Sequence, residues 1–587
     1  MRRSFSKLLL LLACLAPLTP TSAQSTRLDS LDAFVKARMA ERNVRGLSLA
    51  IIKDGKVAVA RAYGVVDEVS KAPVTTATLF QAGSISKPVA ALGALHLVDK
   101  GTLTLDTDVN AKLTSWKVPE NRFTATEKVT LRRLLSHTAG LTVHGFPGYD
   151  VSGPVPTLVQ VLDGTSPTNT APIRVDTTPG AIWRYSGGGF TVAQQLMIDV
   201  TGQPFPQYMQ TAVLGPIGMT SSSFEQPLPS ARASLTATGY YADGRPVRGR
   251  WHLYPEMAAA GLWTTPTDLA KFAIEVQETL AGRGHGVVSQ ATARQYVTEQ
   301  KNGYALGVGL QGAQRFGHGG RDEGFDALLT AGVGSGDGVV VMINANDNSP
   351  MKSRIADYVE RLWGFAGAAT RPAPAATVAA RIDPKRLAAY AGYYEASENN
   401  MVALAPNPDG SGLQILVDGR PAENLLAIDS ARFGSSDRPF RIAFATDARG
   451  AITVTWAAGE PRERSVPRVA PLPSEVRPRP DPDPALAARI STALAALRDG
   501  GAALAGAADV TPGAKNDFGR GRNSALDDFA GATYLGEEDV TGRGIRRHGG
   551  EVARVRLYRM RTPNGERYLM VHVTPAGMVT DYDVLLR

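Results

Sequence analysis

The stretch "QAGSISKPVAALGALHLVDKG", residues 81–101, predicts a helix with a serine in its first turn. A helix tolerates proline only in the first turn, because there the missing N–H would have no partner anyway. Pro88 therefore places the start of this helix at or just before Ser84, four residues earlier. The Ser84 hydroxyl should lie at the positive end of the helix dipole, with Lys87 one turn on along the same face.

The spacing alone leaves two interpretations of Ser84 and Lys87 open. They can be a helix cap and a solvated surface charge, or a nucleophile and its base, since a desolvated lysine has a lowered pKa. Ser-x-x-Lys occurs three times in the chain, and only this pair is supported by a predicted helix start. We also expect the helix to be amphipathic. Its apolar stripe would hold Leu92, Leu95, His96 and Val98.

The N-terminus has the features of a secretory signal. Basic residues precede a short apolar run, and the small-residue site "TSA" follows, which predicts a cleaved signal peptide at residues 1–23 and a periplasmic or secreted protein. The run is shorter than the roughly 20 apolar residues of a membrane span. The only cysteine, Cys14, lies within this segment, so the mature chain should have no disulfide and no thiol chemistry. Lipidation of Cys14 in "LLAC" is the alternative.

Composition and charge exclude few functions. The formal net charge of +8 is a mild bias over 587 residues and does not indicate a nucleic-acid-binding protein. The arginines within residues 542–561 form a local cluster, which we interpret as a solvated face of a C-terminal sheet.

The length predicts about three domains, and two composition breaks divide the chain accordingly. Residues 367–384 are rich in alanine and proline, and residues 466–485 contain seven prolines. We therefore expect domains at 27–366, 383–466 and 482–587.

The first domain mixes strand and helix signals. Asp54-Gly55 lies between two apolar runs and predicts a hairpin. A second hairpin is expected around residues 334–338, followed by a helix over 351–365. Strands from both ends of the domain predict an antiparallel sheet covered by a helical insertion.

The other two domains differ in class. Residues 383–466 show short strands and turns, which predict a small antiparallel barrel or sandwich. Residues 482–587 begin with a helix after Asp483 and end in alternating strands, which predict an α+β module.

Four further motifs give the pair at 84 and 87 its context. They follow it in the order "LRRLLSHTAGL" (131–141), "TPGAIWRYSGGGFTVAQQLMIDVTG" (178–202), "AAGLWTTPTDLAKF" (259–272) and "FGHGGRDEGF" (316–325). Together they closely resemble the serine β-lactamase and penicillin-binding-protein-like hydrolases. The resemblance spans nearly the whole first domain. It implies an α/β (α+β) fold with an antiparallel sheet and a helical subdomain.

The resemblance also implies a site. Ser84 would be the nucleophile, Lys87 its base, and Tyr185 of "YSG" a phenol that shares the proton with the lysine and returns it to the leaving group. The triplet His318-Gly319-Gly320 would line the strand beside the pocket. Backbone N–H groups of Ser84 and Arg321 would hold the oxyanion.

Two departures from the family pattern limit the substrate. Gly187 replaces the usual asparagine two residues after the tyrosine, which removes a polar contact that water or another side chain would have to supply. His318-Gly319 replaces the common Lys-Thr-Gly, and offers neither its permanent cation nor its hydroxyl. An ester, amide or amino-terminal peptide substrate is therefore favoured over a β-lactam or a C-terminal D-Ala-D-Ala.

Two alternative functions stay open, and two other enzyme classes are not supported. A β-lactamase or carboxypeptidase, and a non-catalytic penicillin-binding sensor, stay open. No Gly-x-Ser-x-Gly or His-Glu-x-x-His motif supports an α/β-hydrolase or a metalloprotease. His137 is interpreted as a structural turn residue. We expect a small-molecule or peptide substrate, no metal or organic cofactor, no nucleic acid and no membrane span. The oligomeric state stays open.

The appended domains carry no recognisable site. The middle one resembles the lipocalin-like barrels fused behind such hydrolases, and the last resembles the α+β fold of nuclear-transport-factor-like modules.

Overall fold

The computed structural model describes most of the chain after the first 21 residues. The described residues are 22–241, 244–346, 349–365, 382–397, 400–417, 420–435, 440–448, 450–458, 463–472, 477–518, 526, 532–562 and 565–585. Most of the predicted signal peptide, with Cys14, and most of the first predicted linker lie outside these residues. Within the described part, no helix is long and apolar enough to cross a membrane.

A six-stranded antiparallel sheet forms the base of the N-terminal part, in the order β2-β1-β10-β9-β8-β7. The strands are β1 (Gly46–Lys53), β2 (Lys56–Gly64), β7 (Gly309–Gln311), β8 (Arg315–Asp322), β9 (Phe325–Gly332) and β10 (Gly338–Ile343). Strands from both ends of the predicted domain thus pair in one sheet, as expected.

The predicted turn at Asp54-Gly55 connects β1 to β2. Lys53 pairs with Lys56, so the loop has two residues. Both loop residues have positive φ, 52° for Asp54 and 70° for Gly55, which is the backbone that a tight hairpin turn requires. The sequence prediction of this hairpin is confirmed.

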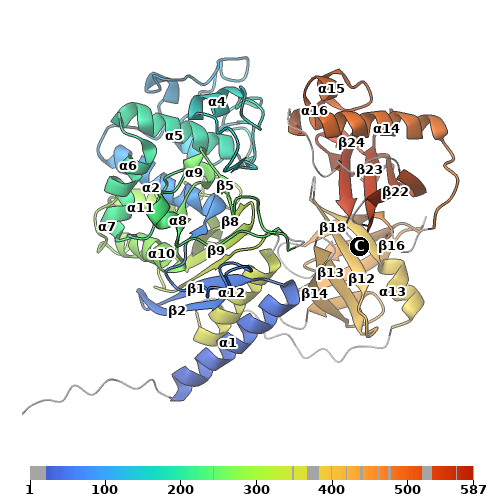
Figure 1. Cartoon of the computed structure of the whole chain (residues 1–587), viewed down its shortest axis with the longest axis horizontal. Coiled ribbons are helices and arrows are strands. Elements are labelled where there is room, and N and C mark those ends of the chain that lie inside the picture. The colour runs from blue at the N-terminus through green and yellow to red at the C-terminus, as the bar shows by residue number, and fades with distance from the viewer. Residues whose placement is uncertain are drawn as a thin grey trace, which may run out of the picture.

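Helices cover both faces of the sheet. On one face, α1 (Ser22–Arg42) and α12 (Ser349–Trp363) pack through Leu31, Val35 and Ile355 against alternate residues of β1 and β10. Figure 1 shows these two helices beneath the sheet, with the helical region above it. On the other face lies α10 (Pro266–Leu280), which contacts β1, β2, β9 and β10. Side chains of a strand point alternately to the two faces of a sheet. Because helices cover both faces here, β1 and β10 are apolar at nearly every position.

The helical region comprises short elements around a central helix. Its helices are η1 (Gly83–Ile85), α2 (Ser86–Asp99), η2 (Val109–Ala111), α3 (Leu131–Leu135), α4 (Leu158–Asp163), α5 (Gly187–Thr201), α6 (Phe205–Met209), η3 (Gln210–Leu214), α7 (Gly215–Ile217), α8 (Ser230–Ala233), α9 (Met257–Ala260) and α11 (Gln290–Tyr296). Two short strand pairs join it, β3 (Phe80–Gln81) with β6 (Trp263–Thr264) and β4 (Tyr149–Asp150) with β5 (His252–Leu253).

The structure corrects two expectations about the central helix. α2 is not amphipathic: nearly every residue from Ser86 to Leu97 is buried, because α5, α9 and η3 pack around it. A helix enclosed on all sides has no need of a polar stripe. Its start also differs, since Ser84 lies in the separate 3₁₀ turn η1 and α2 itself begins at Ser86.

The middle part is a closed eight-stranded antiparallel barrel, β11 to β18 in sequence order. Its strands are β11 (Gly392–Ser397), β12 (Asn400–Pro406), β13 (Gly412–Val417), β14 (Arg420–Ala427), β15 (Arg432–Ser435), β16 (Arg441–Thr446), β17 (Ile452–Trp456) and β18 (Arg464–Ala470). The short helix α13 (Pro384–Tyr390) packs on it, with the Tyr390 ring stacked 4.0 Å from that of Phe444. The barrel is one of the two architectures that the turn pattern predicted.

The C-terminal part is an α+β module. Its sheet has the order β19-β22-β23-β24, and β20 pairs with β21 alone. The elements are α14 (Pro484–Asp499), α15 (Gly501–Gly506), α16 (Pro512–Asp517), β19 (Ala532–Asp539), β20 (Arg546–Arg547), β21 (Gly550–Glu551), β22 (Arg554–Thr562), β23 (Gly565–Val573) and β24 (Val579–Leu585). The predicted helix start is present, with the Asp483 carboxylate accepting from Leu486 N at 2.9 Å.

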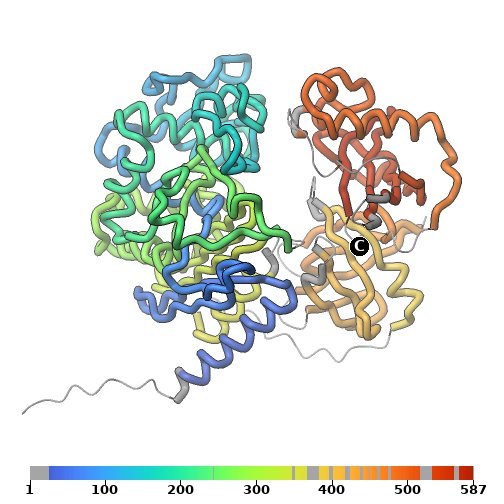
Figure 2. Tube along the Cα trace, in the orientation of Figure 1, coloured from blue at the N-terminus to red at the C-terminus, as the bar shows by residue number. Residues whose placement is uncertain are grey.

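The two faces of this sheet have different partners. Tyr534, Tyr558 and Leu569 pack with α14, whereas Leu535 and Leu557 pack against Val469, Ala470 and other residues of the barrel. Figure 2 follows the chain from the barrel into this module. The prediction that arginines of residues 542–561 lie on a solvated face is wrong for Arg547 and Arg556, whose side chains are fully buried and paired with carboxylates. The three predicted domain boundaries remain predictions.

Candidate active site

The turn η1 and the first turn of α2 bring Ser84 and Lys87 together. Lys87 Nζ lies 3.0 Å from Ser84 Oγ and donates a second hydrogen bond to the Ala259 carbonyl, 2.8 Å away at the end of α9. Lys87 is 2% exposed. The cap of η1 is Ala82, with no side-chain hydrogen bond. The interpretation as a helix cap and a solvated lysine is therefore wrong.

The electrostatic surroundings of Lys87 suit a base. Burial lowers its pKa to about 7, and the nearby Asp322 only partly opposes this effect. A large fraction of the amine is therefore neutral near pH 7 and can accept a proton from a hydroxyl at hydrogen-bond distance.

Tyr185 lies on the other side of the pair. Its ring centre is 4.9 Å from Lys87 Nζ, and its phenol is close enough to the Ser84 side chain to interact with it. The next residue, Ser186, caps α5 by accepting from Gly189 N at 3.1 Å, which fixes the backbone beside the phenol. Burial raises the pKa of Tyr185, so the phenol keeps its proton at neutral pH and can donate it.

His137 holds the segment that carries Tyr185. Its Nδ1 accepts a hydrogen bond from Ser186 N at 3.1 Å, and its ring packs 4.2 Å from the Tyr185 ring. Burial, with Lys87 as the next cause, lowers the pKa of His137 well below its usual value, so the imidazole is neutral. The sequence indicated a structural turn residue. The positive φ of 59° fits a turn. The contacts of His137 with Ser186 and with the Tyr185 ring also hold the phenol in place.

Strand β8 closes the site through close main-chain contact. A Cβ atom at Gly320 would lie 1.9 Å from the Ala82 carbonyl oxygen, and one at Gly83 would lie 2.4 Å from Arg321 N. Glycine is therefore required on both sides of this contact. It brings the backbone of Arg321 against the turn that carries Ser84, as an oxyanion site with these two amides would need.

His318 is a neutral residue whose two ring nitrogens are already engaged. Its Nδ1 hydrogen-bonds to the Gly319 carbonyl, and its Nε2 lies 3.0 Å from the Tyr304 hydroxyl. A carbonyl only accepts, so Nδ1 carries the proton and Nε2 accepts from Tyr304. Burial, with Lys87 adding to it, lowers the pKa of His318 to about 3. This position therefore presents no positive charge to a substrate carboxylate.

Gly187 occupies a position with no room for a side chain. It starts α5, and a Cβ atom there would lie 2.9 Å from the Phe146 ring and 3.1 Å from the His144 carbonyl oxygen. The polar contact expected from an asparagine is thus absent, and the contacts of Lys87 go to Ser84 and the Ala259 carbonyl instead.

We expect Gly187→Asn to destabilise the protein by about 1–3 kcal/mol without raising the rate, because the new side chain must displace Phe146. Urea unfolding followed by circular dichroism measures this change. Gly202→Asn, at the far end of the same helix, is the control: a Cβ atom there would have no neighbour within 4 Å, and asparagine tolerates its positive φ. Equal stability of the two variants would contradict the packing argument.

Sequence reasoning missed three contributors to the site. Tyr304 comes from a loop without a motif, and only the fold brings it to His318. Ala259 acts through its carbonyl, which no residue type can reveal. Asp322 was part of a quoted motif, but nothing in the sequence showed that it would be buried near Lys87.

One group of side chains among the described residues has the geometry to hold a metal ion: His572, Asp581 and Asp583 in the C-terminal module. The fully buried Arg547 lies 3.6 Å from Asp581, and His548 lies 3.3 Å from it. Arg547 already supplies positive charge at this carboxylate. The group therefore fits a buried ion-pair network better than a cation site.

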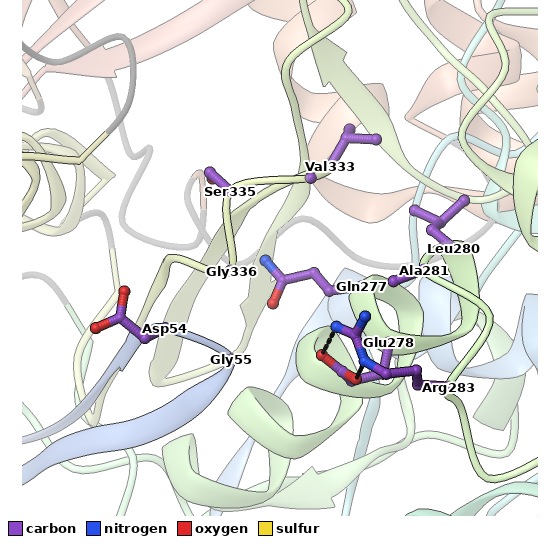
Figure 3. A pocket seen from close by; sticks show the side chains of 11 residues that line it. Asp54, Gly55, Gln277, Glu278, Leu280, Ala281, Arg283, Val333, Ser335 and Gly336 are labelled. Carbon is purple, nitrogen blue, oxygen red and sulfur yellow. Dashed lines mark hydrogen bonds and ion pairs between the residues drawn. The ribbon is translucent and has the colours of Figure 1, made fainter.

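A hollow of about 500 Å³ lies at the other end of the sheet, lined by the Asp54-Gly55 hairpin, the end of α10 and the loop after β9. Figure 3 shows Gln277 at its centre and the ion pair between Glu278 and Arg283 at its edge. Gln277 donates to the Gly332 and Asp337 carbonyls, which ties this helix to the loop. None of the predicted site residues lines the hollow.

A comparison with protein families shows to which family the chain belongs. Residues 31–362 match the family model described as Beta-lactamase. The chain belongs to this family. Esterase EstB of Burkholderia gladioli is 30% identical over 227 residues, which cover 37% of this chain and 55% of the esterase. Penicillin-binding protein 4 of Amycolatopsis lactamdurans is 27% identical over 314 residues, which cover 50% of this chain and 80% of that protein.

A solved structure shows the same fold. The octameric penicillin-binding protein homologue from Pyrococcus abyssi superposes with a TM-score of 0.51 at 21% identity, covering 75% of this chain and 99% of that one. The resemblance drawn from the five motifs is therefore confirmed as Beta-lactamase family membership and fold. The roles of the individual site residues remain predictions.

Proposed function

We propose that this member of the Beta-lactamase family is an exported serine hydrolase that forms an acyl-enzyme on ester or amide substrates, including amino-terminal peptides. The observation that carries the proposal is the buried Lys87 amine, 3.0 Å from the Ser84 hydroxyl. Export rests on the predicted signal peptide alone. The relative named an esterase supports the reaction class.

Acylation follows from the contacts of Ser84. Neutral Lys87 takes the hydroxyl proton as Ser84 Oγ bonds to the substrate carbonyl carbon, and the carbonyl oxygen becomes an oxyanion. The amides of Ser84 and Arg321 would stabilise this charge. The bond to the leaving group then breaks, and the leaving group takes a proton from Tyr185. Lys87 then gives the proton it took from Ser84 to the Tyr185 phenolate, which returns the amine to its neutral form.

Deacylation repeats these steps with water. Water adds to the acyl carbon and gives its proton to the Lys87–Tyr185 pair. The ester bond to Ser84 Oγ breaks, and the serine oxygen regains a proton. The products are a carboxylic acid and the free enzyme.

The substrate class follows from His318. This residue is neutral and donates its ring proton to Gly319, so it cannot pair with a carboxylate as a lysine could. β-Lactams and C-terminal D-Ala-D-Ala carry such a carboxylate, whereas simple esters and amides do not.

A comparison of substrates tests this proposal. We expect p-nitrophenyl acetate to be turned over with a kcat/KM at least about 100-fold above that of a chromogenic cephalosporin, since a missing charged partner costs roughly 3 kcal/mol. Release of p-nitroaniline from D-alanine p-nitroanilide tests whether the protein accepts amino-terminal peptide substrates. Faster hydrolysis of the cephalosporin would favour the β-lactamase alternative. A stable acyl adduct without turnover would favour a sensor.

We also expect the Tyr304 hydroxyl to contribute to turnover, because it donates the hydrogen bond that His318 Nε2 accepts. Tyr304→Phe leaves His318 Nε2 without its donor, and we expect kcat/KM to fall about tenfold with an unchanged pH profile. Tyr358→Phe is the matched control, because that hydroxyl bonds to Ser30 on the opposite side of the sheet. Equal kinetics of the two variants would show that the Tyr304–His318 contact has no role in turnover.

A further inference from the structure

One of the two hydrogen bonds of the Lys87 amine goes to the short helix α9. The acceptor is the carbonyl oxygen of Ala259, 2.8 Å from Nζ. The last carbonyl groups of a helix have no partner within it, so this oxygen is available to the amine. Because Lys87 Nζ bonds both to this oxygen and to the Ser84 hydroxyl, the position of α9 sets where the amine lies beside the serine.

α9 is a single helical turn without a cap of its own. One turn restricts the backbone of several residues in exchange for few hydrogen bonds, so contacts from outside must hold it. Glu256 precedes the turn, but its side chain makes no capping hydrogen bond. The amide of Ala258, in the first turn, has no acceptor within the helix. α9 therefore depends on a side chain from another element.

Gln194 of α5 is that side chain. Its Oε1 accepts from Ala258 N at 2.9 Å, and its Nε2 donates to the Pro255 carbonyl at 3.0 Å. Gln194 is 2% exposed, so bulk water does not compete for these bonds. α5 and α9 are in contact, and Figure 1 shows them side by side. The two hydrogen bonds of this one amide group fix the start of α9 to α5.

The segment just after α9 is tied to the turn that carries Ser84. Leu262 N donates to Ser86 Oγ at 2.9 Å, and Ala82 N donates to the Leu262 carbonyl at 2.9 Å. α9 is thus held at its start by α5 and beyond its end by η1 and α2. Without the contacts of Gln194, only the second attachment would remain.

α5 thereby acts on both groups that would transfer protons. Tyr185 lies two residues before Gly187, the first residue of the helix, and Gln194 lies seven residues after it, about two turns along. Gly187 offers Lys87 no side chain. The helix that lacks a direct contact with the lysine holds it through Gln194 and α9 instead.

We propose that Gln194 is a positioning residue, which holds the Ala259 carbonyl at the place where it accepts from Lys87. The proposal rests on the proposed function, in which Lys87 is the base. A carbonyl oxygen stabilises an ammonium group more than a neutral amine. Loss of the Gln194 contacts should therefore lower the pKa of Lys87 and misplace the amine relative to Ser84.

The titratable groups around Lys87 come from several elements, and one of them lies on the segment that Gln194 holds. That group is Glu256, whose pKa burial raises to about 8. A Glu256→Gln background removes this neighbouring titration from a pH measurement on Lys87. The other groups are Tyr185, His137, His318 and Asp322.

Gln194→Met tests the proposal, because methionine keeps most of the volume of the side chain and removes both hydrogen bonds. We expect kcat/KM for p-nitrophenyl acetate to fall about tenfold. The rise of the acylation rate with pH, expected near pH 7 in the parent protein, should shift down by about one unit, with or without Glu256→Gln. Gln194→Asn, one methylene too short to reach both partners, should do the same and serves if the methionine variant does not fold.

Gln194→Glu should keep the parent rate to within about threefold, because burial keeps its carboxyl protonated and able to make both hydrogen bonds. Gln195→Met is the matched control, since Gln195 is 4% exposed on the same helix and bonds to Asp199. It should change neither the rate nor the pH profile. Equal losses in Gln194→Met and Gln194→Glu, or an unmoved or raised pH profile in Gln194→Met, would overturn the proposal.

The titration of Lys87 can also be measured without turnover, by ¹³C NMR of the full chain labelled at lysine Cε. Lys87→Met identifies the signal. We expect a lower midpoint in Gln194→Met than in the parent protein and in Gln195→Met. Equal midpoints would overturn the role of Gln194 even in an active hydrolase. A parent protein that hydrolyses no substrate would instead overturn the proposed function, and a lower midpoint in Gln194→Met would still support the hold of Gln194 on Lys87.

Discussion

Ser84→Ala is expected to abolish hydrolysis of p-nitrophenyl acetate, with kcat/KM falling by at least about 10³-fold. The variant removes the one oxygen that Lys87 Nζ contacts at 3.0 Å, so no acyl-enzyme can form. Nitrophenol release gives the rate, and intact mass after treatment with a fluorophosphonate reports the covalent adduct. Both signals should be present in the parent protein and absent from the variant.

Ser230→Ala provides the control for this experiment, because Ser230 is exposed on the short helix α8. It should retain full activity and the adduct. An adduct that persists in Ser84→Ala would mean that another residue is the nucleophile. A folded parent protein with neither signal would rule out Ser84 as a working nucleophile.

Lys87→Met should produce the second largest loss, about 10³-fold in kcat/KM, because it removes the base and keeps most of the apolar volume. In the parent protein only neutral Lys87 can take the Ser84 proton. The rate of acylation should therefore rise with pH through about 7, the pKa to which burial lowers this lysine, and level off above it. This limb should vanish in the variant.

The pH profile distinguishes a base from a merely structural lysine. His318, with its pKa lowered to about 3, contributes no second limb near neutral pH. Lys100→Met, at the exposed end of α2, should leave both the rate and the limb unchanged. Retention of the limb at pH 7 in Lys87→Met would show that another group is titrating.

The fold could be predicted where the signals were local or came in a fixed order. Asp54-Gly55 predicts its hairpin because the tight turn needs positive φ angles at two successive residues, and few residue types adopt them. Asp483 predicts the start of α14 because a carboxylate satisfies the free amides of a first turn. The amphipathic prediction for α2 was wrong, because neighbouring helices enclose that helix and no local pattern reports the number of its neighbours.

The sequence by itself determined the order of the motifs and the closeness of Ser84 to Lys87, since only two residues lie between them at the start of a predicted helix. Only the tertiary structure decided the chemistry of that pair. Burial among α5, α9 and β8 lowers the Lys87 pKa, and contacts between segments far apart in the chain place Tyr304 against His318 and Phe146 against Gly187. Desolvation and packing are properties of the assembled core, which is why they could not be read from residue spacing.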